Sequence, residues 1–94
     1  MRLKWKRSAL ADLSEIADYI AQENSEAARK VISEIRKQTQ VLSSHPQIGR
    51  RGRASDTYEL VIARYPYIVA YEITGESLDI LAVVHMSKLW PEKI

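Results

Sequence analysis

The sequence predicts an α+β fold in which a helical hairpin packs on one face of a small, mainly antiparallel sheet, in the order β-α-α-β-β-β. Three observations support this prediction. The spacing of apolar residues changes once, from helical in the first half to alternating in the second. Two helical segments are joined by a short link, and three strands follow with short links of their own. With 94 residues, the chain forms a single domain over residues 1–94.

The first half of the chain contains one short strand and two helices. Residues 2–6 alternate polar and apolar side chains, as a half-buried strand does. Apolar side chains then recur at helical spacing over residues 8–20, with Ser8 as the expected N-cap, and again over 28–42. Asn24 and Ser25 interrupt the pattern and can cap the second helix. Two helices with so short a link are expected to form an antiparallel hairpin.

The second half contains a loop and three strands. Residues 46–57 include two glycines and a proline without periodicity, which is typical of a loop. Segments rich in Val, Ile and Tyr follow over residues 58–64, 67–73 and 78–85. Their connections are too short for a parallel crossover, so we expect antiparallel pairing.

Alternation along these strands predicts which side faces the helices. The side without acidic residues is expected to pack on the helices, and in the last strand it ends with Ala82 and Val84. The opposite side carries apolar residues that no remaining segment is expected to cover: Val61, Ile68, Ala70, Leu81 and Val83. Because a contiguous exposed apolar patch usually marks a binding surface, we expect a protein partner there.

The composition indicates a cytoplasmic protein that does not enter a membrane. The chain has no cysteine, which excludes disulfides and thiolate metal sites and fits a reducing compartment. Its longest apolar runs, residues 67–71 and 80–84, are far shorter than a membrane span. Acidic residues from Asp12 onward occupy the place where a signal peptide would be apolar. The net charge of +2 conceals basic segments that suit an acidic or phosphate-bearing partner.

Any catalytic chemistry in this chain depends on His85. It lies far from His45 with no metal-ligand spacing, and no nucleotide-binding motif is present, so we expect neither a metal nor a cofactor. A histidine near cations could serve as acid or base in a metal-free ribonuclease. The cations available are Arg50, Arg51, Arg53, Arg64 and Lys88. The alternative is that His85 only caps the strand end by hydrogen bonding.

Short blocks follow one another in a characteristic order along nearly the whole chain. They are Leu3-Lys4-Trp5, Ala9, Asp12-Leu13, Ile16-Ala17-Asp18-Tyr19-Ile20, Ala27-Ala28, Leu42, His45-Pro46-Gln47-Ile48-Gly49-Arg50, Glu59-Leu60-Val61-Ile62, Pro66-Tyr67-Ile68-Val69-Ala70-Tyr71, Ile80-Leu81-Ala82-Val83-Val84-His85 and Trp90-Pro91. Together they resemble the ParE/RelE superfamily of toxins from type II toxin–antitoxin modules. The resemblance implies this fold and a cognate antitoxin that neutralises the toxin.

Two activities occur in this superfamily. ParE-like members poison DNA gyrase and trap it with cleaved DNA, whereas RelE-like members cut messenger RNA on the ribosome. Many ribonuclease relatives carry an arginine where this chain has Ile68, and some an aromatic residue where it has Met86. An aliphatic side chain cannot neutralise a phosphate, and a thioether cannot exchange a proton. Tyr58 and Lys88 depart from the ParE pattern, where arginines often stand, although Lys88 keeps the charge.

We therefore favour a gyrase inhibitor without catalysis of its own, acting in growth inhibition and plasmid stabilisation. One rival is a ribosome-dependent mRNA endoribonuclease that uses His85, Arg50, Arg53 and Arg64. Another is an inactive relative that only binds its antitoxin and regulates the operator of the module.

The favoured interpretation assigns two binding surfaces. The target-binding candidates are Arg50, Arg51, Arg53, Lys88 and Trp90. The antitoxin-binding candidates are the apolar residues Val61, Ile68, Ala70, Leu81 and Val83. We expect operator DNA to be contacted only through the antitoxin.

Overall fold

The computed structural model describes residues 1–88 and residue 90. Its elements are β1 (Arg2–Trp5), α1 (Arg7–Ala21), α2 (Ser25–Gln40), the 3-10 turn η1 (Val41–Ser43), β2 (Arg50–Arg51), β3 (Thr57–Val61), β4 (Tyr67–Thr74) and β5 (Ser77–His85). The predicted α+β fold is confirmed. The predicted loop over residues 46–57 holds one additional element, the two-residue strand β2.

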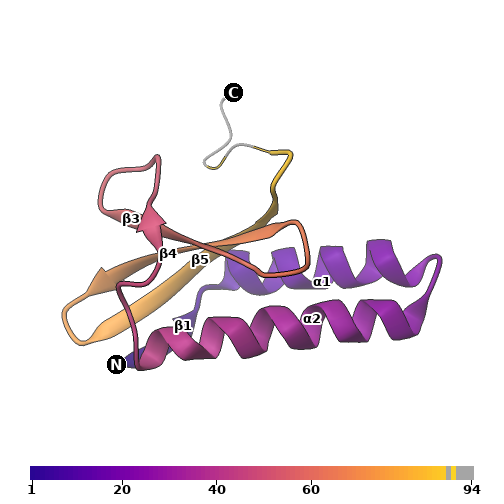
Figure 1. Cartoon of the computed structure of the whole chain (residues 1–94), viewed down its shortest axis with the longest axis horizontal. Helices are drawn as coiled ribbons and strands as arrows, with labels where there is room; N and C mark the ends of the chain where they lie inside the picture. Colours follow the sequence, from indigo (N-terminus) through magenta and orange to yellow (C-terminus); the bar gives the residue numbers. More distant parts are fainter. Residues whose placement is uncertain (89, 91–94) are drawn as a thin grey trace.

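The strands form one sheet in the order β1-β5-β4-β3-β2. β1 pairs in parallel with β5, and the other neighbours pair antiparallel, so the sheet is mainly antiparallel as predicted. Helices α1 and α2 lie side by side along one face of the sheet, whereas the loop that contains β2 and residues 86–88 after β5 lie on the other side (Figure 1). We call these the helix face and the outer face.

The two helices begin in different ways. Of the two predicted cap residues, Asn24 caps α2, because its side chain accepts a hydrogen bond of 3.0 Å from the Ala27 N–H, and Ser25 is the first residue of the helix. The N-cap of α1 is Lys6, which makes no side-chain cap. The predicted cap, Ser8, lies inside the first turn and donates instead to the Leu81 carbonyl oxygen of β5 at 2.8 Å.

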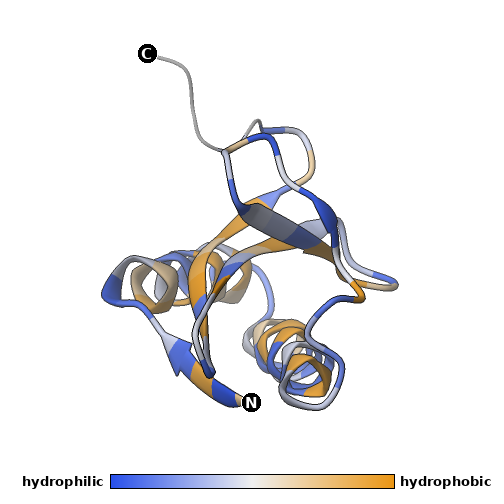
Figure 2. Cartoon of the chain, turned by 90° about the vertical axis from the view of Figure 1, so that its left-hand side faces the viewer, coloured by the Kyte–Doolittle hydropathy of each residue, from blue (hydrophilic) through white to orange (hydrophobic). Residues whose placement is uncertain are grey.

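The core lies between the helices and the helix face, where apolar surfaces meet (Figure 2). Its buried members come from both helices, from η1, from β4 and β5 and from the residue after β3, and they include Leu13, Val31, Ile35, Leu42, Ile62, Val69, Tyr71, Leu78 and Ile80. The helical spacing of apolar residues in α1 and α2 and the alternation in the strands therefore converge on one apolar volume.

A β-bulge interrupts the pairing of β4 with β5. Tyr71 pairs with Ile80, and the preceding residue Ala70 pairs with Ala82. Leu81 is thus the extra residue of β5 and has no cross-strand partner in β4. An extra residue reverses the alternation of the strand beyond it, so the residues after Leu81 face the opposite way from the prediction.

This reversal corrects the predicted orientations of the residues after Leu81. Ala82, expected on the helix face, pairs with Ala70 on the outer face. Val83, expected on the outer face, is only 3% exposed and belongs to the core. Val84, expected on the helix face, pairs with Ile68 and lines the outer face instead. Strict alternation is valid only for an unbroken ladder, and one extra residue moves all later side chains to the other face.

The first turns of α1 close the edge of β5 that β1 leaves free. Beyond the end of β1, the Val83 N–H donates to the Asp12 Oδ2 at 2.9 Å, next to the bond from Ser8 to Leu81. Burial raises the pKa of Asp12, although the Val83 hydrogen bond acts in the opposite direction. Polar helix residues therefore satisfy backbone groups that would otherwise lie open at a sheet edge.

Within the described part of the chain, neither helix has the length and apolarity needed to cross a membrane.

Candidate functional site

A hollow on the outer face is lined by all five predicted target-binding residues, among others. It has a volume of about 280 Å³ and is lined by Arg50, Arg51, Arg53, Glu59, Ile68, Val84, Met86, Lys88 and Trp90. We call it the arginine basin. Its arginines come from β2 and the following loop, and its other wall comes from the end of β5 and the residues after it.

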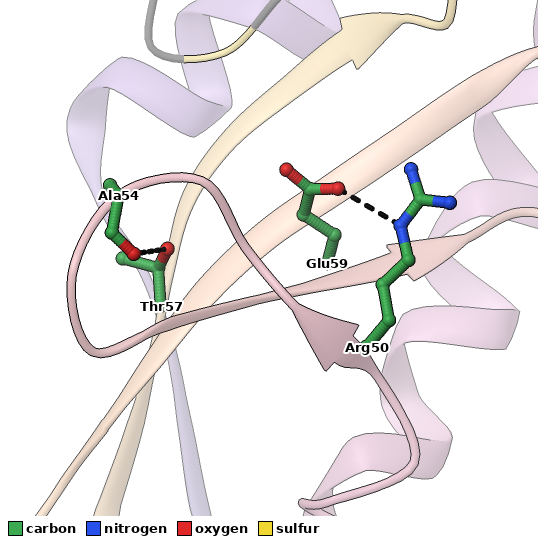
Figure 3. Close-up of polar contacts among 4 residues, drawn as sticks. All are labelled: Arg50, Ala54, Thr57 and Glu59. Atoms are coloured by element: carbon green, nitrogen blue, oxygen red, sulfur yellow. Dashed lines mark hydrogen bonds and ion pairs between the residues drawn. The ribbon is translucent and has the colours of Figure 1, made fainter.

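An ion pair between β2 and β3 lies within the arginine basin. Arg50 Nε lies 3.1 Å from Glu59 Oε1, and β2 and β3 pair these two residues across the ladder (Figure 3). The Glu59 side chain is only 8% exposed, whereas that of Arg50 is 58% exposed. Because the contact uses Nε, both Nη groups of Arg50 stay available to a ligand. A carboxylate this deeply buried needs such a partner.

Tyr71 attaches the loop that carries Arg50 to the core. Its ring is fully buried, and its hydroxyl accepts a 3.0 Å hydrogen bond from the Gly49 N–H and donates at 2.9 Å to the Pro46 carbonyl oxygen. A Cβ at Gly49 would lie 2.5 Å from the Tyr71 oxygen, so only glycine fits. Burial raises the pKa of Tyr71, which keeps the hydroxyl protonated as a donor.

The next loop residues are held by their own turn. The Gly52 N–H donates to the Thr57 carbonyl oxygen at 2.8 Å, and the Thr57 hydroxyl donates to the Ala54 carbonyl oxygen at 2.6 Å (Figure 3). The Arg51 guanidinium lies 6.0 Å from the centre of the Tyr58 ring, at the outer limit of a cation–π contact. The loop therefore presents its arginines from an ordered backbone.

His85 lies outside the residues that line the basin. Its Nδ1 accepts a 3.1 Å hydrogen bond from the Ser87 N–H and lies 2.9 Å from the Ser87 Oγ. The ring also meets Tyr67 edge to face. Because Nδ1 accepts from a backbone N–H, the proton of the neutral ring is on Nε2. His85 thus makes the hydrogen bond at the strand end that the structural alternative required.

The structure separates the candidate ribonuclease residues. Arg50 and Arg53 line the basin, but neither Arg64 nor His85 is among its lining residues. Arg64 is exposed in the connection between β3 and β4, with a positive φ of 79°. Four residues predicted from sequence to work at one phosphate therefore do not line one hollow.

The outer face is less exposed than the sequence indicated. Val61 is 41% exposed, but Ile68 and Ala70 are buried, Leu81 is half-buried in the bulge, and Val83 lies in the core. The expectation that no segment remains to cover this face was wrong, since the β2 loop and residues after β5 lie over it (Figure 1). A short row of aliphatic side chains in register, Val61, Ile68 and Val84, is what the outer face retains.

Sequence reasoning missed three residues of the basin. Glu59 drew no attention because its role depends on β2 returning beside β3. Val84 was placed on the wrong face because of the bulge, and Met86 was considered only as a departure from ribonucleases. The one signal for Glu59 was its place as the single acidic residue of an otherwise uncharged segment, close to the three basic residues of the preceding loop.

The comparisons with known proteins decide the family. The model of the family "ParE toxin of type II toxin-antitoxin system, parDE" matches residues 3–90. This chain belongs to the ParE toxin family. The ParE family member described here is therefore a toxin of the type II toxin–antitoxin class, and its two helices on a mixed five-stranded sheet match chains of a solved ParDE system and a solved RelBE complex in fold.

Two relatives match nearly the whole chain. The chain is 38% identical over 91 residues to the protein Y4kP of Sinorhizobium fredii, covering 97% of this chain and 94% of that one. It is 32% identical over 85 residues to toxin RelE2 of Caulobacter vibrioides, with 90% and 94% coverage.

Two solved structures share the fold. A chain of the chromosomal ParDE system from P. aeruginosa superposes with a TM-score of 0.82 at 30% identity, covering 90% of this chain and 95% of that one. A chain of the intact E. coli RelBE toxin–antitoxin complex superposes with a TM-score of 0.66 at 15% identity, covering 89% and 94%. The second likeness concerns the fold alone.

Proposed function

We propose that this ParE family member inhibits DNA gyrase through its arginine basin, without catalysis, and that a cognate antitoxin neutralises it. The observation that supports this most is the composition of the basin. Among the residues that the structure describes, its lining combines four cations with one carboxylate, and that carboxylate is buried against Arg50. A basin of this kind can bind an acidic surface but lacks a free group to move protons.

The apolar wall of the basin also favours a protein target. Ile68 stands where many ribonuclease relatives carry an arginine, and it forms one wall together with Val84 and Trp90. Aliphatic and aromatic surface next to exposed arginines is typical of protein interfaces, in which such residues carry much of the binding energy.

An antitoxin partner follows from the family and from the solved neighbours, which are toxin–antitoxin systems by name. For its contact on the outer face we now propose Val61 and Val84, which lie on either side of Ile68, because Ile68, Ala70 and Val83 are buried within the chain itself. Operator DNA would then be contacted through the antitoxin.

The second candidate function is a ribosome-dependent mRNA endoribonuclease. It is supported by the likeness to toxin RelE2 and by the cations of the basin, which could hold a phosphate. In this case His85 would have to reach the RNA from outside the basin lining, through its Nε2.

Purified gyrase and purified ribosomes distinguish the two functions. We expect the wild-type protein to slow supercoiling and accumulate cleaved DNA, while message on ribosomes stays intact. Replacing Arg51 and Arg53 together by alanine should weaken the inhibition about tenfold or more, since interface arginines are often worth over 1 kcal/mol. These two are chosen because Arg50 also stabilises the buried Glu59.

The matched control is His85→Gln, which should leave the inhibition of gyrase largely intact. Cuts in ribosome-bound message that His85→Gln abolishes, with no effect on gyrase, would establish the endoribonuclease instead.

A further inference from the structure

The turn between β3 and β4, residues 63–66, holds an arginine in an unfavourable backbone conformation. Arg64 has a φ of 79°. In this left-handed region Cβ is crowded by a backbone carbonyl oxygen, so glycine adopts it freely and aspartate adopts it more readily than most residues. Asp56, the other non-glycine residue with a positive φ in the described part of the chain, is of that tolerated type. Arg64 is not, and glycine would be less strained in its place.

The chain itself gains no contact from the Arg64 side chain. The residue is exposed, and its guanidinium makes no ion pair, hydrogen bond or cation–π contact with the residues that the structure describes. Arg50 and Arg36, by contrast, contact Glu59 and Trp5. Strained residues persist where the surrounding structure holds them, and they gather at functional sites. The strain at Arg64 therefore points to a contact outside the chain.

Helix α2 holds this turn through a single side chain. The Ala63 N–H donates to Gln38 Oε1 at 2.8 Å, and Gln38 Nε2 donates to the Ala63 carbonyl oxygen at 3.2 Å. Gln38 Nε2 also donates to Glu34 Oε2 at 2.8 Å, which orients the amide. Both backbone groups of the residue before Arg64 are thus satisfied from α2, and the arginine is presented from an ordered backbone.

The other end of the turn is bonded to a wall of the arginine basin. The Pro66 carbonyl oxygen accepts a 2.7 Å hydrogen bond from the Met86 N–H, and Met86 lines the basin. Next to this bond, Tyr67 pairs with His85 at the end of β5. A stable protein interface covers about 800 Å² of each partner, so a protein seated in the basin also covers neighbouring segments. The turn that carries Arg64 is such a segment.

The chemistry of the guanidinium defines what it can bind. Its N–H donors form a planar fork that matches a carboxylate or a phosphate with two parallel hydrogen bonds. Because the turn is already ordered, the backbone loses little further freedom when the arginine binds. The apolar wall of the basin favours a protein as the molecule that covers both, so the matching group is a carboxylate.

We propose that Arg64 binds an acidic side chain of gyrase, beside the contact made by the arginine basin. The inference rests on the proposed inhibition of gyrase and adds a contact residue to it. Arg64 accordingly keeps its strained conformation because the complex, and not the free chain, uses its side chain.

The test compares stability with inhibition in Arg64→Gly. Glycine relieves the strain but makes the unfolded chain more flexible, so the variant should melt at the temperature of the wild type or up to about 5 °C above it. The concentration of the full chain that halves the supercoiling activity of purified gyrase should rise about tenfold, as for other interface arginines. Arg64→Ala removes the guanidinium and keeps the strain, so it should lose as much inhibition without any rise in melting temperature.

Two control variants match the change in backbone and the change in charge. Asp56→Gly places glycine at the other positive-φ position, and Lys30→Ala removes one cation from an exposed position on α2. Both should stay within about twofold of the wild type in inhibition, because exposed charges away from an interface contribute little.

Wild-type inhibition by both Arg64→Gly and Arg64→Ala would overturn the inference and leave the gyrase proposal in place. A melting temperature of Arg64→Gly below that of the wild type would also overturn it, because the position would then carry no strain. Binding of the wild-type chain to linear DNA without gyrase, lost in Arg64→Gly, would assign the guanidinium to a phosphate instead. A wild-type chain that leaves supercoiling unaffected would refute the proposed function itself, and the inference with it.

Discussion

The two faces of the sheet differ in the side chains they carry and in what covers them. On the helix face, Val69, Leu78 and Ile80 are wholly buried and pack against apolar helix residues. On the outer face, the strand centres carry Ala70 and the carboxylate of Glu59, and a loop rich in arginine lies over them. The same strands thus supply a dry core on one side and a charged, partly covered surface on the other.

The difference between the two faces indicates where residues can change to alter target recognition. Apolar burial on the helix face stabilises the fold whatever binds elsewhere. The outer face is stable only while Glu59 keeps its partner Arg50, because an unpaired buried carboxylate is costly. Variation that alters target recognition is therefore expected on the outer face and in its loop, at positions free of this pair.

The difference between the two faces is tested most directly by truncating one aliphatic residue on each face and comparing the losses of stability. Ile80→Ala, at a fully buried position, should lower the free energy of unfolding by about 2–5 kcal/mol, since it leaves a cavity in the core. Val61→Ala, at a 41% exposed position on the outer face, should cost under about 1 kcal/mol. Urea denaturation followed by circular dichroism measures both. Equal losses would show that the outer face is as much a core as the helix face.

A smaller loss of stability is expected at Tyr71, whose ring lies in the core and whose hydroxyl holds the loop of the outer face. Tyr71→Phe removes the hydroxyl that binds Gly49 and Pro46 and should cost about 1–3 kcal/mol, because two backbone groups lose their partner. It should also accelerate hydrogen exchange of the Gly49 amide. The control is Tyr67→Phe, since the Tyr67 hydroxyl makes no hydrogen bond to the described residues, and it should change stability by a few tenths of a kcal/mol.

If Tyr71→Phe leaves the Gly49 amide as protected as before, the loop is held by β2 pairing and by the ion pair, and the hydroxyl is not its anchor. Gyrase inhibition measured on the same variant would then be unchanged as well.

The smallest change in stability is expected at Asp12, which accepts a hydrogen bond from the Val83 N–H at the edge of β5. Burial raises its pKa in the folded state, so its contribution to stability is fully present below the unfolded value of 3.8 and is lost as the pH rises through the folded pKa. Asp12→Asn keeps an acceptor for the Val83 N–H and removes this loss, so it should be at least as stable as wild type at pH 7 and flatten the acid part of the profile. Thermal melts between pH 3 and pH 7 measure this.

Asp12→Ala is the contrast to that variant, because it removes the acceptor as well and should cost about 1 kcal/mol at pH 7. A stability profile of Asp12→Asn that keeps the slope of the wild type would assign the pH dependence to other groups.

Local patterns predicted most of the fold, and long-range pairing accounts for what they missed. Helical spacing placed α1 and α2, and the Asn24 cap was readable because capping is local. The bulge at Leu81 was not, since it arises from how β5 pairs with β4, and nothing at residue 81 itself marks it.

The candidate site was predictable to the same degree. The arginines of one loop stayed together because they are neighbours in sequence, and Lys88 joined them from the far end of the chain. Glu59 and the separation of Arg64 from the basin depend on β2 and on the connection between β3 and β4, which hydropathy patterns do not encode.

Gly49 restricts how this toxin can diverge. A side chain there would meet the Tyr71 ring on one side and the Glu59 carbonyl oxygen, 2.9 Å away, on the other, so shrinking the tyrosine alone would not make room for it. We therefore expect neither the replacement of Gly49 alone nor the replacement of Tyr71 alone to make room for a side chain at this position. We therefore expect sequence changes in this loop to lie beyond Arg50. Relatives that bind a different target are expected to differ there in loop length and charge, while the contact between Gly49 and Tyr71 is kept.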